Sequence, residues 1–302
     1  MKKIFLSLVA AFTIMAANAT ILRVSNLPGS SAPYTSISDA VEAAIPGDTV
    51  MVEGSPTNYA TSGLTISKRI VLIGPGYNKI TNGLVSEGFN PAYVSDITLQ
   101  YNNIQMIGMT VLRSVNIDKA NIVVTRCKVG RVALNGEDAT GCIIHQNYIT
   151  GNIEHGYWTG TPNVCITNNI MEESGLISNL RSNSYIAYNT FLKEKNSPVF
   201  EDITGCTIEN NILPFDYTSD ETNSSTNNYV FSETPYYDTS SEVAIRKGEQ
   251  AFSNGIYGAF AGDDPYVISG VPAGPVIEDV TIPASIEQGQ PLKVTIKLGI
   301  QE

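Results

Sequence analysis

The sequence predicts an all-β protein: a single-stranded, right-handed parallel β-helix, a solenoid of ~20-residue coils with an N-terminal capping helix and a C-terminal β-hairpin cap. Composition and an internal repeat support this prediction. Among 302 residues, 25 are Gly and 15 are Pro, and only 16% are charged, against about 25% in a typical protein. Such a chain is rich in turn formers and poor in helix-surface charge. Its 42% of hydrophobic residues exclude a disordered acidic protein.

The repeat is marked by four asparagines spaced 22, 20 and 22 residues apart, Asn147, Asn169, Asn189 and Asn211. An isoleucine stands three residues before each of them, at Ile144, Ile166, Ile186 and Ile208. A second apolar residue stands two positions after each, at Ile149, Met171, Phe191 and Leu213. A Gly or Asn stands six positions before each, at Gly141, Asn163, Asn183 and Gly205. Two earlier copies fit the same frame, with Met109 and Cys127 in the Asn position.

Each copy predicts a turn, a strand, a second turn and a second strand. The Gly or Asn accepts the positive φ of the first bend, and alternation points two apolar residues inward. A third short strand precedes a copy, as at 97–99, 115–117, 132–134 and 199–200. Three short strands per coil describe a parallel β-helix whose coils stack ~4.8 Å apart. We expect the asparagines to form an internal amide ladder, at bends where Asn itself tolerates the left-handed conformation.

A leucine-rich repeat is the alternative, because its core also places an Asn among spaced apolar residues. The position eight residues before the Asn would then be Leu, whereas it holds Ala139, Thr161, Arg181 and Ile203. The returning half of each copy is β-branched and has no helical period. The β-helix is therefore the favoured interpretation.

The first 19 residues predict an export signal. Lys2 and Lys3 precede an apolar run over 4–16, and Ala17-Asn18-Ala19 supplies a cleavage pattern of small residues. The run is shorter than the ~20 residues that span a bilayer, and no later segment reaches that length. We expect a secreted, periplasmic or cell-surface protein without a membrane span. Its net charge of −11 argues against nucleic acid as a partner.

The two ends of the solenoid are predicted to be capped. Ser36 with Asp39 resembles a helix-starting box, the apolar residues of 37–44 recur at helical spacing, and Pro46-Gly47-Asp48 ends the helix. The sequence thus divides into a cap over 20–60, a β-helix over 61–235 and a capping segment over 236–302. Within the last, 276–282 and 292–298 alternate like two strands. Two strands are too few for a sandwich, so we expect a hairpin packed on the last coil.

The N-terminal third resembles a known group of proteins. The run Tyr34 to Ala44, then Pro46 to Val50, then Ile70 to Gly74 resembles the amino-terminal signature of secreted right-handed β-helix proteins of the pectin-lyase-like superfamily. The ending over 255–272 resembles that of exported β-helix proteins of Bacteroidetes. The resemblance extends through the coils to about residue 235. It implies the fold but no single activity, because this superfamily mixes lyases, hydrolases, esterases and adhesins.

The four cysteines are predicted to be unbridged. Cys142 and Cys206 share one inward position but lie three coils apart, roughly 14 Å, beyond the ~7 Å reach between bridged Cα atoms. Cys127 replaces a ladder Asn, and Cys165 falls on the outward phase. We expect Cys127, Cys142 and Cys206 to act as small buried hydrophobic residues.

Chemistry is expected at the variable turns that follow the third strand of each coil. Asp118, Asp138 and Asp202 lie nine residues before the Asn position, and Arg181 lies eight before it. The longest turn holds Glu154, His155, Tyr157 and the only tryptophan, Trp158. These side chains suggest a shallow sugar-binding edge, with an aromatic ring stacked on a pyranose. A solvated loop with its aromatic residues folded against the coil is the alternative.

Ligands at this edge are predicted from its side chains. Tyr157, Trp158, His155, Glu154 and Asp202 are the candidate glycan-binding residues. Asp118, Glu137 and Asp138 are candidate ligands of an optional Ca²⁺, and no cofactor is required. His145 lies mid-strand on the outward phase, where lateral packing is the favoured interpretation.

An enzymatic role is the alternative to glycan binding. Asp118, Asp138 and Arg181 are the candidate catalytic residues of a Ca²⁺-dependent polysaccharide lyase or of a glycoside hydrolase acting on an acidic polysaccharide. However, Arg181 lies three coils from Lys119, and the Asn-Thr-Asp, Asp-Asp and Gly-His-Gly motifs of the family's polygalacturonases are absent. The leading hypothesis is therefore a non-catalytic exported protein that binds polysaccharide or cell-surface glycan. A structural module that contacts other proteins is the third hypothesis.

Overall fold

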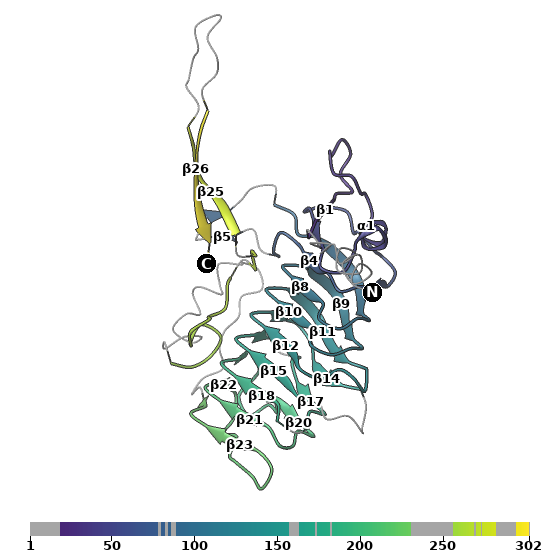
Figure 1. The fold of residues 1–302 in the computed structure, drawn as a ribbon. Helices are drawn as coiled ribbons and strands as arrows, with labels where there is room; N and C mark the ends of the chain where they lie inside the picture. Colours follow the sequence, from purple (N-terminus) through teal and green to yellow (C-terminus); the bar gives the residue numbers. More distant parts are fainter. Residues whose placement is uncertain are drawn as a thin grey trace, which may run out of the picture.

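The chain winds into a parallel β-solenoid (Figure 1). The computed structural model describes residues 19–77, 80–81, 84–85, 89–156, 163–172, 174–181, 183–230, 256–268, 270–272, 274–281 and 294–301. Its first sheet, sheet A, takes one strand from each coil, and all ten strands are parallel: β1 (Ile21–Val24), β2 (Thr49–Val52), β4 (Val71–Ile73), β8 (Gln105–Ile107), β10 (Val123–Thr125), β12 (Cys142–His145), β15 (Val164–Thr167), β18 (Tyr185–Ala187), β21 (Thr207–Glu209) and β23 (Ser224–Thr226).

The opposite wall, sheet B, is continuous in the early coils and divides in the later ones. The early part pairs β3 (Leu64–Ile66), β7 (Tyr93–Leu99), β9 (Thr110–Ile117) and β11 (Lys128–Leu134). One branch continues through β13 (Tyr148–Ile149), β16 (Ile170–Met171), β19 (Thr190–Phe191), β22 (Ile212–Leu213) and β24 (Tyr229–Val230). The other continues through β14 (Ile153–His155), β17 (Ile177–Ser178) and β20 (Phe200–Glu201). The two branches correspond to the second and third strands predicted for each coil.

Like residues stack on like residues along the solenoid. Ile144 pairs with Ile166, Ile166 with Ile186 and Ile186 with Ile208, and all four are fully buried. On the facing wall Ile149 pairs with Met171, which pairs with Phe191. The register confirms the predicted repeat, and the apolar core lies between the walls. The alternation of apolar and polar residues explains the position of the core, because successive side chains of a strand point to opposite faces.

The predicted asparagine ladder is present inside one corner. Each amide oxygen accepts from the backbone N–H and the amide of the preceding ladder residue: Asn169 Oδ1 lies 2.9 Å from Asn147 N and 3.0 Å from its Nδ2. The same pair of contacts joins Asn189 to Asn169 and Asn211 to Asn189. Asn228 extends the ladder by one further coil. These hydrogen bonds satisfy buried polar groups that are shielded from water. Each such group would cost ~1–3 kcal/mol if it had no partner.

The expectation that the ladder asparagines themselves adopt the left-handed conformation is wrong. The residue just before each of them has positive φ instead: Gln146 (56°), Asn168 (54°), Tyr188 (55°) and Asn210 (56°). The left-handed residue turns the chain outward, and the following Asn can then point its amide inward along the stack. The first bend behaves as predicted at Gly141, Asn183 and Gly205.

The cysteines are free, as predicted. Cys127, Cys142 and Cys206 are buried, and Cys165 is half-buried on the outer face. In the ladder position, Cys127 donates its N–H to Asn147 Oδ1 at 2.9 Å. Burial raises the pKa of its thiol to about 12, which suits an inert packing residue.

The short helix α1 (Ile37–Ala43) confirms the predicted helix. Ser36 Oγ accepts from Asp39 N at 3.4 Å, and the helix buries Ile37, Ala40 and Val41 against β1, β2 and β3. The solenoid nevertheless starts before residue 61, since β1 and β2 already belong to sheet A.

After the last coil, the segment 256–272, here called the strap, runs back along the outside of the solenoid. Near its start, Gly258 N donates to Asn210 O at 2.8 Å. Near its end, Gly270 lies against the backbone of Arg126 and Gly108, several coils earlier. Tyr266 is buried and contacts Tyr77 through their hydroxyl groups. The strap covers an apolar outer surface that includes Tyr148, Ile170 and Leu192.

The predicted hairpin exists but does not cap the last coil. Strands β25 (Gly274–Thr281) and β26 (Thr295–Gln301) pair antiparallel. They lie beside β5 (Ile80–Thr81), which forms a small antiparallel pair with β6 (Leu84–Val85), and far from β23 (Figure 1). The strap explains this position. Its residue Gly270 lies against Gly108, and the four residues from there to the start of β25 at Gly274 span at most ~14 Å, so the hairpin must lie near the early coils.

Candidate functional site

Three stacked turns form an open cleft at one edge of the solenoid, here called the corner cleft. The turns follow β7, β9 and β11. The cleft has a volume of about 690 Å³, and its polar lining includes Gln100, Tyr101, Asn102, Lys119, Glu137 and Asp138. A second hollow with Asp118 and Asn135 in its lining adjoins it at Gln100 and Lys119. Their volumes, about 690 and 440 Å³, fall in the range of small-ligand sites.

Backbone hydrogen bonds between coils hold these turns in register. Gln100 N donates to Ile66 O at 2.9 Å, and Asp118 N donates to Leu99 O at 3.1 Å. Asn135 N donates to Ile117 O at 2.9 Å. Because each turn leaves the stack at the same point, its side chains stand beside those of neighbouring coils ~4.8 Å away.

The charges in the corner cleft are mostly negative. Lys119 Nζ forms an ion pair with Asp138 at 2.8 Å, and this carboxylate raises the pKa of Lys119. Gln100 Nε2 donates to Asp118 Oδ2 at 3.3 Å, and Glu137 is exposed. Thus the structure brings together Asp118, Glu137 and Asp138. Among the described residues, however, no three His, Cys, Asp or Glu side chains cluster closely enough to hold a metal ion, so the arrangement does not favour the expected Ca²⁺ site.

Two other predicted residues lie on the same edge but not in the cleft. Arg181 follows β17 and forms a bridge with Thr204, while Asp202 follows β20 and is exposed. By strand order, Arg181 lies three coils from Asp118, roughly 14 Å along the stack. The structure therefore does not assemble Asp118, Asp138 and Arg181 around one sugar ring.

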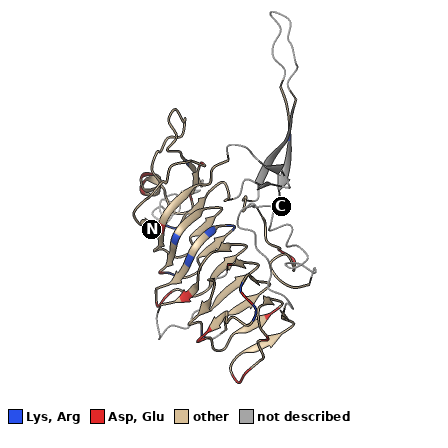
Figure 2. Cartoon of the chain, turned by 180° about the vertical axis from the view of Figure 1, so that it is seen from behind, with Lys and Arg blue, Asp and Glu red and all other residues tan. Residues whose placement is uncertain are grey.

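The longest predicted turn contributes less than expected. Glu154 forms an ion pair with Arg131 of β11 at 2.8 Å. Arg131 is one of the basic residues of β9 and β11, which lie on the sheet surface shown in Figure 2. The expectation that His155 binds ligand is wrong: it aligns with Leu134 and points into the core, 3% exposed. Strand β14 includes Glu154 and His155, which were predicted to lie in the turn, and its alternation places His155 on the inward phase. Tyr157 and Trp158 lie outside the described residues.

Sequence reasoning missed the side chains that supply the aromatic and amide part of the cleft. Tyr101 is 46% exposed, and Asn102 Oδ1 accepts from Ala120 N at 3.0 Å. Their signal was present, because 100–102 follows the strand ending at Leu99 as 118–120 follows Ile117.

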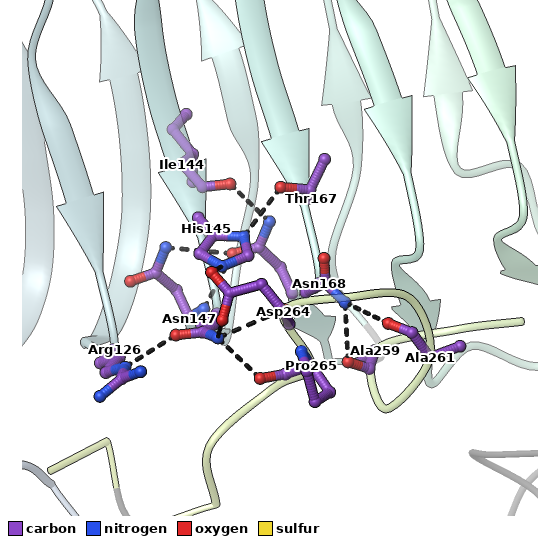
Figure 3. Close-up of polar contacts among 12 residues, drawn as sticks. Arg126, Ile144, His145, Asn147, Thr167, Asn168, Ala259, Ala261, Asp264 and Pro265 are labelled. Atoms are coloured by element: carbon purple, nitrogen blue, oxygen red, sulfur yellow. Dashed lines mark hydrogen bonds and ion pairs between the residues drawn. The ribbon is translucent and has the colours of Figure 1, made fainter. Parts of the chain in front are cut away.

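A third hollow, here called the strap groove, lies between the outer face of sheet A and the strap. Its volume is about 340 Å³, and it is lined by Ile73, Ile107, Val123, Ile143, Arg126 and His145, with Asp264 and Pro272 from the strap. His145 Nε2 lies 3.0 Å from Asp264 Oδ2, and Nδ1 lies 2.8 Å from Thr167 Oγ1 (Figure 3). His145 thus packs laterally, as expected. Burial lowers its pKa despite the opposing effect of Asp264.

Comparisons with known proteins add little beyond the fold. No family model matches the sequence, and no curated protein matches it either. Among solved structures, the chain is similar to the pectin methylesterase from Aspergillus niger in deglycosylated form, at 10% identity and a TM-score of 0.43, over 76% of this chain and 95% of that chain. In the part of the chain that the structure describes, no helix has the length and apolarity to cross a bilayer.

Proposed function

We propose that this protein is an exported, non-catalytic glycan-binding solenoid whose ligand occupies the corner cleft. The observation that carries the proposal is the clustering of an exposed aromatic ring with amide, carboxylate and ammonium groups in one open cleft of about 690 Å³. The ring of Tyr101 offers an apolar face for the C–H side of a pyranose. Gln100, Asn102 and Asp138 offer planar groups that bind pairs of neighbouring hydroxyls.

The charge of the cleft favours neutral sugars over uronates. Three carboxylates, Asp118, Glu137 and Asp138, stand against the single ammonium of Lys119, which is already paired. A polyanion would meet net repulsion there. This argues against the acidic polysaccharides that the alternative lyase and hydrolase hypotheses require. Export of the chain rests on the pattern of its first 19 residues.

The test is a glycan-array screen of the mature chain, followed by calorimetry on the neutral oligosaccharide that binds best. We expect Tyr101→Ala to weaken binding roughly tenfold, since loss of a stacking surface costs ~1–1.5 kcal/mol. Asp138→Asn should weaken it to a similar degree through its contacts with hydroxyls.

Two surface substitutions away from the cleft serve as controls. Tyr229→Ala removes a comparably exposed ring, 42% exposed, from the last coil, and Asp216→Asn removes an exposed carboxylate. Both should bind like the wild type. Equal affinity of wild type, Y101A and D138N for every bound glycan would contradict the proposal, as would the absence of any bound glycan.

A further inference from the structure

The outer face of sheet A carries a cluster of aliphatic residues where the strap groove lies and becomes polar in the last coils. Outward positions in the early and middle coils hold Ile73, Ile107, Val123 and Ile143. The same two columns hold Thr207, Glu209, Ser224 and Thr226 in the last coils. Ile143 is 39% exposed. An aliphatic stripe that faces a solvent-filled hollow costs free energy unless a ligand covers it.

Arg126 stands at the edge of this stripe with part of its guanidinium unused. Its backbone has φ of 56°, which turns the side chain toward the strap. Nε donates to Gln146 Oε1 at 2.8 Å, and Nη1 donates to Val271 O at 3.1 Å. Among the described residues, no group accepts a hydrogen bond from Nη2. Desolvation lowers the pKa of this half-buried side chain, so an anionic acceptor would offset the cost of burying its charge.

The other polar groups of the groove are already satisfied. Asp264 Oδ2 accepts from His145, and Oδ1 accepts from Gln146 Nε2 at 2.7 Å. Gln146 Nε2 also donates to Pro265 O at 2.6 Å. Asn168 donates to the carbonyls of Ala259 and Ala261 at 3.1 and 2.8 Å, as Figure 3 shows. These contacts fix the strap wall and leave Arg126 Nη2 and the Thr125 hydroxyl as donors available to a ligand.

We propose that the strap groove binds a small amphipathic carboxylate. Its hydrocarbon body would cover Ile107, Val123 and Ile143, and its carboxylate would accept a hydrogen bond from Arg126 Nη2. The groove's volume of about 340 Å³ suits one short acyl chain. This site is separate from the corner cleft, since the two share no lining residue.

The experiment is calorimetric titration of the full mature chain with three probes. Octanoate carries both parts of the proposed ligand, 1-octanol carries the chain with an uncharged head, and acetate carries the carboxylate alone. We expect octanoate to bind saturably, with a Kd on the order of 1 mM or lower, roughly tenfold tighter than octanol and more than tenfold tighter than acetate.

Two variants separate the two halves of the site. Arg126→Gln should weaken octanoate roughly tenfold and leave octanol unchanged. Ile143→Thr should weaken both about fivefold, whereas Ile21→Thr, an exposed outward residue of the same sheet, should change neither. Because Arg126 also contacts the strap, I143T keeps the test informative if R126Q fails to fold. Absence of saturable octanoate binding, or binding that neither R126Q nor I143T changes, would overturn the proposal.

Discussion

A single ladder asparagine satisfies several buried groups at once. Asn169 accepts from the N–H and amide of Asn147 and donates to Ile144 O at 2.8 Å. Replacement by alanine leaves the Asn147 N–H and the Ile144 carbonyl without these partners in the dry interior. At ~1–3 kcal/mol for each unsatisfied group, we expect Asn169→Ala to lower the free energy of unfolding by about 3 kcal/mol, measured by urea denaturation.

A matched amide on the surface provides the control for this substitution. Asn152 is half-buried, and among the described residues its side chain makes one long hydrogen bond, to Glu154 Oε2 at 3.5 Å. Asn152→Ala should change the free energy of unfolding by no more than about 0.5 kcal/mol. Equal effects of N169A and N152A would show that the ladder adds nothing to stability.

Residues that belong to the repeat could be predicted from sequence, and residues outside it could not. Asn147 and Ile144 recur at fixed spacing, so one structural explanation covers every copy. His155 sits where the turn length varies, and β14 includes it although the sequence analysis placed it in the turn. Tyr101 could not be predicted from the repeat, because the aligned positions of the next two turns hold Lys119 and Gly136 rather than aromatic residues.

At the scale of elements, the strap is held to the solenoid by polar contacts that include those of His145. Its imidazole faces Asp264 from the strap, Thr167 from β15 and the charge of Arg126 from the preceding corner. Burial lowers the pKa of His145 below its usual value near 6.5. The unfolded chain therefore binds a proton more readily than the folded chain as pH falls below 6.5, and stability that is present above this pH is lost.

This sign gives a pH prediction for the strap. Between pH 7.5 and 5.5, the free energy of unfolding of the wild type should fall more steeply than that of His145→Gln, which cannot titrate at this position. Denaturant midpoints at the two pH values measure the difference. The second histidine, His155, is present in both proteins, so its contribution to the pH dependence cancels in the comparison. A wild type that is equally stable at both pH values, or that gains stability on acidification, would contradict the prediction.

The docking of the strap was beyond prediction from sequence for a physical reason. Its contacts join residues far apart in the sequence, 119 positions between His145 and Asp264, and no periodicity marks them. The hairpin strands were predicted by their alternation, but their place depends on where the strap delivers them. Local patterns thus predict elements, whereas the position of a non-repeating element depends on surface complementarity.

Across the whole molecule, the strap links coils that otherwise contact only their neighbours. A solenoid without such a link unfolds as a chain of nearest-neighbour units. The strap contacts Asn210 and Ile212 near one end and Tyr77 and Gly108 near the other. We therefore expect it to make unfolding of the intervening coils more cooperative.

Substitution of a strap glycine tests this coupling. Gly270 has φ of +60°, and an added Cβ would lie 2.4 Å from the Arg126 carbonyl oxygen, which the backbone cannot easily move. Gly29 also has positive φ, +80°, but nothing lies within 4 Å of its added Cβ. Both substitutions by alanine have a conformational cost of about 1 kcal/mol, and only Gly270→Ala also displaces the strap.

Native-state hydrogen exchange followed by mass spectrometry should show faster exchange over several coils, β10 to β21, in G270A and no such spread in G29A. Faster exchange confined to the strap itself would mean that the coils hold together without it.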